Sequence, residues 1–178
     1  MGLLTHDDLV ELLNLLIDKL AVGGADGVEI RVVGGAAIML AHDPDRGLTR
    51  DVDALGARGQ ALVEAAAAEI ADERGLPPDW LNFKVAMYAP DPDRPEPAFD
   101  VLIERAGVTI SVGSPRLLLA MKLHAGRGRR DIADIDLLLD ACGVRTAAEA
   151  VSIFEAHYGA EVMKERSRVH LAARFEAT

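Results

Sequence analysis

One short acidic segment limits most strongly what this chain can fold into. Residues 49–55 alternate polar and apolar side chains, which is typical of a β-strand. Because residues two apart on a strand point to the same face, we expect Asp51 and Asp53 to project together, away from Val52. Two carboxylates about 4 Å apart repel by about 4 kcal/mol at an effective dielectric constant of about 20. The pair therefore indicates either an exposed strand in water or a site for a cation such as Mg²⁺ or Mn²⁺.

Two glycines precede this acid pair. Gly34 and Gly35 lie between an alternating apolar segment, residues 28–33, and a short apolar segment that predicts a helix over 36–41. Glycines at such a place let a phosphate approach the N–H groups of a helix N-terminus, where the helix dipole favours anions. A plain tight turn is the alternative. The order strand, Gly-Gly, helix, loop and Asp-x-Asp strand is the more specific signal, and it favours a phosphate and metal site.

The remaining pattern predicts an α/β (α+β) chain, a mixed β-sheet flanked by helices with a helical C-terminal portion. Thr5 can cap an N-terminal helix that ends at Gly23, and Ser114 can cap a later one. The expected strands cover residues 28–33, 48–55, 81–89, 98–103 and 108–112, and a proline-rich surface loop covers 90–97. The other expected helices cover residues 36–41, about 56–74, 116–125, 131–141, about 147–157 and about 161–175. We expect one domain over residues 1–178, with its core at about 25–113 and a helical half at about 114–178.

Four further charged residues are candidates for the same site. Asp100 lies in a hydrophobic-Asp-hydrophobic segment, so it is either a third metal ligand and general base or an exposed acid at a strand start. Lys122 lies in an otherwise apolar helix, where it either neutralises phosphate charge or extends to water. Asp131 and Asp134 share a helix face, where they either position Lys122 or a nucleotide sugar, or face solvent.

Composition narrows the choice of partners. The formal net charge of −10 argues against broad, non-specific affinity for nucleic acid, but not against a focused site. In so acidic a chain, the best candidate for polynucleotide contact is the cluster Arg127, Arg129 and Arg130, with a solvated helix junction as the alternative. A single cysteine, Cys142, excludes an internal disulfide and favours a reducing, cytoplasmic setting. No apolar run reaches the roughly 18 residues that a membrane span needs, and the acidic N-terminal segment does not match a signal peptide.

The motifs together resemble a known family. The chain is similar to the nucleotidyltransferase (DNA polymerase β-like) superfamily in the segments Val33-Gly34-Gly35-Ala36 and Thr49-Arg50-Asp51-Val52-Asp53. The gap of 15 residues between Gly35 and Asp51 is long for that pattern. The segments around Lys122 and from Arg129 to Asp134 are similar to the lysine and aspartate motifs of its AbiEii-like branch, and residues 77–82 to small uncharacterised members. The resemblance covers about residues 28–140.

This resemblance implies an activity and a set of roles. It implies the nucleotidyltransferase fold and transfer of a nucleoside monophosphate from a triphosphate such as ATP or CTP to an acceptor hydroxyl. In the AbiEii-like branch, which contains toxins of bacterial type IV toxin–antitoxin systems, some members add nucleotides to the 3′ end of tRNA. A separately encoded antitoxin protein would then be a partner. The implied metal ligands are Asp51, Asp53 and Asp100, which with Lys122 would be catalytic. The implied nucleotide-binding residues are Gly34, Gly35, Thr49, Arg50, Lys122, Asp131 and Asp134.

Two other functions remain open at this point. The same reaction on a small molecule or a protein side chain is one, and the acidic net charge would attract a small cationic substrate. A non-catalytic nucleotide-binding module is the other, since it needs no third acid.

Overall fold

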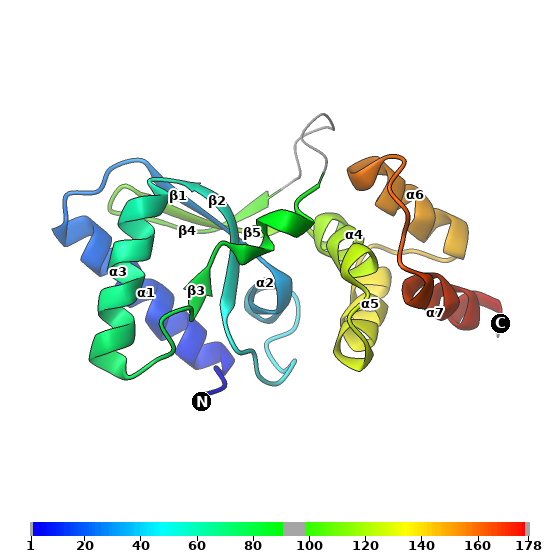
Figure 1. Cartoon of the computed structure of the whole chain (residues 1–178), viewed down its shortest axis with the longest axis horizontal. Helices are drawn as coiled ribbons and strands as arrows, with labels where there is room; N and C mark the ends of the chain where they lie inside the picture. The colour runs from blue at the N-terminus through cyan, green and yellow to red at the C-terminus, as the bar shows by residue number, and fades with distance from the viewer. Residues whose placement is uncertain (1, 91–98, 177–178) are drawn as a thin grey trace. The chain divides into compact units, whose positions relative to one another are not determined.

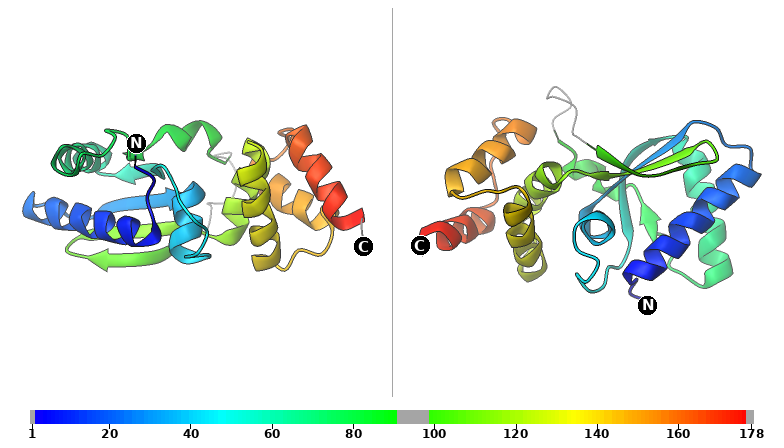
Figure 2. Two further views of the ribbon diagram at one scale, coloured as in Figure 1. Left: turned by 90° about the horizontal axis from the view of Figure 1, so that it is seen from below. Right: turned by 180° about the vertical axis from the view of Figure 1, so that it is seen from behind.

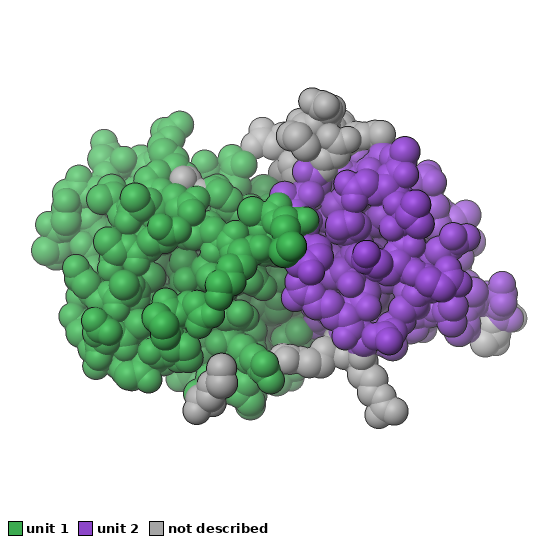
Figure 3. Space-filling view, in the orientation of Figure 1, with its two compact units in different colours: residues 1–87, 99–112 green, residues 88–98, 113–178 purple. Residues whose placement is uncertain are grey.

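The protein divides into two compact units. A computed structural model of the chain describes residues 2–90 and 99–176, apart from the side chains of Ala57, Arg129 and Arg130. Unit 1 comprises the described parts of residues 1–87 and 99–112, and unit 2 those of residues 88–98 and 113–178 (Figure 3). The division after residue 112 falls beside the expected start of the helical half.

Unit 1 is a mixed five-stranded sheet with helices on one face (Figures 1 and 2). Its strand order is β3-β2-β1-β5-β4, in which β1 runs antiparallel to β2 and parallel to β5, and β2 runs parallel to β3. Residues Ala106 and Gly107, both with positive φ, join β4 to β5 in a tight hairpin turn. The elements are α1 His6–Val22, β1 Val28–Val33, α2 Gly34–Ala41, β2 Val52–Arg58, α3 Gln60–Arg74, β3 Leu81–Asn82, the 3₁₀ helix η1 Lys84–Tyr88, β4 Phe99–Arg105 and β5 Val108–Gly113.

The core of unit 1 lies between this sheet and its helices. Alternate β1 residues Val28, Ile30 and Val32 are buried, as are the apolar residues that form a stripe along α1. The predicted cap of α1 is confirmed: Thr5 Oγ1 accepts the N–H of Asp8, and the Asp8 carboxylate accepts the N–H of Thr5 in return. Local sequence signals therefore set both the start of α1 and the face it buries.

Unit 2 consists of helices. Its elements are α4 Pro115–Ala125, α5 Arg129–Ala141, α6 Ala147–Tyr158 and α7 Glu165–Glu176. The predicted Ser114 cap is present, since its hydroxyl accepts the N–H of Leu117. An aromatic cluster fills the centre, where the His124 ring stacks on Tyr158 with 4.3 Å between centroids and the Tyr158 hydroxyl donates to the Tyr88 carbonyl. Over the described part of the chain, no helix has the length and apolar character needed to cross a membrane.

Two expected strands differ from the structure. The strand expected over 48–55 begins only at Val52, because Thr49 pairs its backbone with Leu4 in an isolated bridge. The strand expected over 81–89 is a two-residue strand followed by η1, so that prediction was wrong. The Asn82 side chain accepts the N–H of Lys84, which turns the chain out of the sheet. Most of the expected surface loop, residues 91–97, lies outside the described residues.

Candidate functional site

The glycine turn and Asp53 of the acid pair meet where β1 ends. Val33, the last β1 residue, pairs with Asp53 of β2, and Gly34 then starts α2 with φ +69°. A Cβ on Gly34 would lie 3.0 Å from Oδ2 of Asp53. Only glycine combines this left-handed backbone with room for the carboxylate, so the Asp53 side chain rests on the first turn of α2. The expected closeness of Asp53 to the glycine turn is thereby confirmed.

Asp51 lies just ahead of β2. It is half-buried, as is Asp53, and Asp53 points away from the buried face because its neighbours Val52 and Ala54 are fully buried. Thr49, an expected nucleotide ligand, is buried, and its hydroxyl donates to the Asp51 carbonyl oxygen at 3.2 Å. Thr49 therefore holds the backbone that leads into the acid pair, while Arg50 beside it is exposed.

Strand β3 lies next to the strand that carries Asp53. Its Asn82 pairs with Asp53 in the parallel register, so the two residues are neighbours on adjacent strands. The position is set by Trp80, which is buried and donates its indole N–H to the Ala67 carbonyl of α3 at 2.9 Å. The segment over residues 77–82, which the sequence analysis noted without a role, thus anchors the strand next to the acid pair.

A lysine that the sequence analysis missed lies beside these acids. Lys84 Nζ donates to Oδ2 of Asp79 at 2.6 Å, and this contact is the main reason why the pKa of Lys84 lies above its ordinary value. The fields of Asp51 and Asp53 raise the same pKa further, so both carboxylates lie within electrostatic reach of the ammonium group. In turn, the Lys84 ammonium lowers the pKa of Asp79. Nothing in the local sequence marks Lys84, since its place depends on β3.

Arg46 is the other residue that sequence reasoning missed. A Cβ on Gly35 would lie 3.1 Å from Nη2 of Arg46, so the guanidinium covers the second glycine as the Asp53 carboxylate covers the first. A turn holds the arginine there, with the Arg46 N–H donating to the Asp43 carbonyl at 3.1 Å. An arginine between a glycine turn and an acid pair was the available signal.

The donor set of this site fits Mg²⁺. Carboxylate oxygens from one or two acids, completed by phosphate oxygens, are the usual ligands of that ion in nucleotide sites. The expected third ligand is not brought to the pair: Asp100 is exposed on β4, three strand positions from β2 in the sheet, or roughly 14 Å at the usual strand spacing. Within residues 2–90 and 99–176, no group of three His, Cys, Asp or Glu side chains is arranged to hold a metal ion.

In unit 2, Lys122 forms ion pairs with both candidate aspartates, Asp131 and Asp134. Its Nζ lies 2.9 Å from Oδ1 of Asp131 and 2.7 Å from Oδ2 of Asp134, and all three side chains are largely buried. Asp131 Oδ2 also accepts the N–H of Arg127 at 2.6 Å. Of the open alternatives, the structure shows the aspartates positioning Lys122, which ties α4 to α5. A role of Lys122 toward phosphate remains a prediction, and the side chains of Arg129 and Arg130 lie outside what the structure describes.

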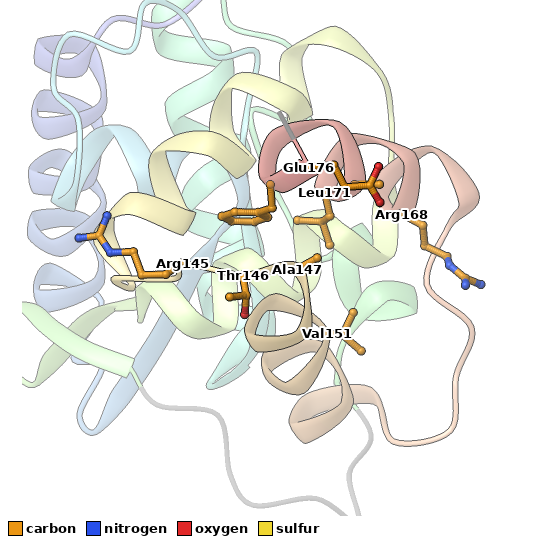
Figure 4. Close-up of a pocket in the computed structure, with 9 residues that line it drawn as sticks. Arg145, Thr146, Ala147, Val151, Arg168, Leu171 and Glu176 are labelled. Atoms are coloured by element: carbon orange, nitrogen blue, oxygen red, sulfur yellow. The ribbon is translucent and has the colours of Figure 1, made fainter. Parts of the chain in front are cut away.

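A separate hollow of about 420 Å³ lies between α6 and α7 (Figure 4). Its floor is apolar, with Leu171 and Phe175 among the lining residues. Arg145 and Arg168 stand on opposite sides of it and extend outward. None of the expected site residues lines this hollow.

Comparisons with protein-family models, with curated proteins and with solved structures find no match to this chain. The resemblance to nucleotidyltransferases rests on the motif residues of the sequence and stays a prediction.

Proposed function

We propose that this protein is a Mg²⁺-dependent nucleotidyltransferase that moves a nucleoside monophosphate from a nucleoside triphosphate to an acceptor hydroxyl. One observation carries the proposal: the Asp53 carboxylate rests on the Gly34 turn at the N-terminus of α2. A metal ligand and a phosphate-binding turn are then parts of one site. The motif resemblance points to RNA, with the 3′ end of tRNA as the acceptor, and to a cytoplasmic toxin that a cognate antitoxin protein controls.

The chain's own residues would act by positioning and charge. Asp51 and Asp53 would hold Mg²⁺, which supplies neutralisation of phosphate charge when bound. The N–H groups after Gly34 and Gly35 would receive phosphate oxygens, and Arg46 stands beside them. In the reaction, the acceptor oxygen bonds to the α-phosphorus, the bond from that phosphorus to the β-phosphate oxygen breaks, and pyrophosphate leaves. The hydroxyl proton passes to a neighbouring base or water.

A labelling assay tests this function. The protein is incubated with each α-labelled triphosphate, Mg²⁺ and total tRNA, and label in the tRNA band is counted. We expect transfer by the wild type, its loss in Asp51→Ala, and full activity in the control Asp72→Ala, which removes an exposed acid from α3. The absence of transfer to RNA from all four triphosphates would reject the RNA version.

The position of Asp100 favours a second candidate, a nucleotide-binding module without turnover, because among the described residues no third acid completes a metal-binding group with Asp51 and Asp53. It predicts Mg²⁺-dependent binding of triphosphate with no pyrophosphate released on any acceptor. Release of pyrophosphate with label on a small molecule or on protein would instead favour transfer to a non-RNA acceptor, which the net charge of −10 would help to recruit if it is cationic.

A further inference from the structure

Lys84 is held beside the acid pair by the chain itself. Asn82, the residue opposite Asp53 in the β2–β3 register, uses its side-chain oxygen to accept the Lys84 N–H at 3.0 Å. Asn82 is buried, so the backbone of Lys84 has a fixed place relative to β2. The long side chain of Lys84 can therefore change its ion-pair partner while its backbone stays in place.

That partner, Asp79, is easily exchanged. The Lys84 and Asp79 side chains are 70% and 54% exposed, and ion pairs in water contribute little to stability. The contact therefore positions the ammonium group only weakly. An incoming anion of higher charge can displace the Asp79 carboxylate at small cost.

The charge of the expected ligand favours exchange of the Asp79 carboxylate for a phosphate group. A nucleoside triphosphate keeps a net negative charge after Mg²⁺ binds, and the carboxylates of the acid pair add to the negative charge of the site. The ammonium of Lys84 already lies in the field of both acids, and a lysine is a common point-charge partner for phosphate. Lys122 has two buried carboxylates at hydrogen-bonding distance in its own unit, which leaves Lys84 the more available cation.

We propose that Lys84 contacts the β- or γ-phosphate of the bound triphosphate and leaves Asp79 to do so, which makes the Asp79–Lys84 pair a control on triphosphate affinity. This inference rests on the proposed function, since it needs a triphosphate at the acid pair. It gives specificity for triphosphate over monophosphate to a residue outside the motifs.

Calorimetry with a non-hydrolysable ligand tests it. Wild type, Lys84→Met, Asp79→Asn and the double variant are titrated with Mg²⁺ and α,β-methylene ATP or its CTP counterpart, and with the matching monophosphate. We expect Lys84→Met to weaken triphosphate binding about tenfold, the loss expected for one exposed charge-assisted hydrogen bond, and to leave monophosphate binding unchanged. Asp79→Asn should tighten triphosphate binding a few-fold, and this gain should vanish in the double variant. Lys84→Arg should keep most of the affinity.

The outcomes separate the two claims. If the wild type binds neither triphosphate analogue, the proposed function and this inference both fail. If the wild type binds and Asp51→Ala does not, but Lys84→Met binds like the wild type, only the role of Lys84 is overturned. An equal loss for triphosphate and monophosphate, or an Asp79→Asn gain that persists without Lys84, would also overturn it. Circular dichroism of each variant checks that it is folded.

Discussion

The Asp53 carboxylate packs against Gly34: Oδ2 of Asp53 lies 3.0 Å from the point that a Cβ on Gly34 would occupy. The last residue before that glycine, Val33, is the β1 partner of Asp53, so the strand pairing brings the two together. A substitution in the first turn of α2 should therefore shift the Asp53 carboxylate.

Replacing Gly34 with alanine should damage both stability and binding. The left-handed backbone costs about 1–2 kcal/mol for a residue with a Cβ, and the added methyl group must push the Asp53 carboxylate aside. We expect urea denaturation to show that loss and calorimetry to show at least tenfold weaker binding of Mg²⁺ with a triphosphate analogue.

Gly24→Ala is the matched control. Gly24 has φ +71°, close to that of Gly34, but nothing lies within 4 Å of its added Cβ. It should lose a similar amount of stability and keep the wild-type affinity. Equal affinity in both variants would show that Asp53 does not depend on the turn.

The Lys122 cluster, which consists of Lys122, Asp131 and Asp134, should behave as a buried group of ion pairs. Lys122→Met leaves the carboxylates of Asp131 and Asp134 buried without their cation, which should cost about 3–5 kcal/mol in the free energy of unfolding. Urea denaturation measures the loss. The triple variant that adds Asp131→Asn and Asp134→Asn removes the uncompensated charge and should recover most of it. A loss below about 1 kcal/mol in the single variant would contradict the burial of the group.

Much of this architecture is predictable because its signals are local. The Thr5 cap of α1, the alternating β1 and the Ser114 start of α4 all follow from residues within one turn or strand, and all three are observed. The motif spacing also places Asp53 near Gly34 correctly, because a strand, a glycine turn and an antiparallel return leave little choice of geometry.

The placement of Lys84 and Asp100 depends on how distant strands pair, which local patterns do not record. β3 ends after Asn82 because that side chain bonds to the backbone, and its position depends on Trp80 binding α3, which no periodicity records. Lys84 reaches the acid pair only through this strand. Asp100 follows the expected local pattern, yet the order of the strands puts it far from β2. Spacing predicts which residues share a strand, whereas sheet order decides which strands are neighbours.

Trp80 should support β3 and through it the site. Trp80→Phe removes the indole donor and leaves the Ala67 carbonyl without that partner, which should lower the free energy of unfolding by about 1–3 kcal/mol. Guanidinium denaturation followed by circular dichroism measures it, because the variant lacks the chain's single tryptophan. An unchanged midpoint would show that this hydrogen bond does not anchor β3.

Stability should fall at alkaline pH through Tyr158. Burial, with a smaller effect from the Glu161 carboxylate, raises the pKa of Tyr158 far above its ordinary value. The unfolded chain releases this proton above about pH 10 while the folded chain retains it, so the stabilisation is complete below that pH and declines above it, by up to about 1.4 kcal/mol per pH unit. Denaturation of wild type and Tyr158→Phe from about pH 8 to about pH 11 should show the variant with the shallower decline. Parallel declines would contradict a buried, protonated Tyr158.

The most direct test of the account is whether the acid pair holds a divalent cation together with a triphosphate. Electron paramagnetic resonance counts bound Mn²⁺, which substitutes for Mg²⁺, during a titration in the presence of α,β-methylene ATP or its CTP counterpart. The account predicts triphosphate-dependent Mn²⁺ binding by the wild type and by Asp72→Ala, and its loss in Asp51→Ala and Asp53→Asn. Wild-type protein that binds no Mn²⁺ with either analogue, or acid-pair variants that bind it equally well, would contradict the central claim.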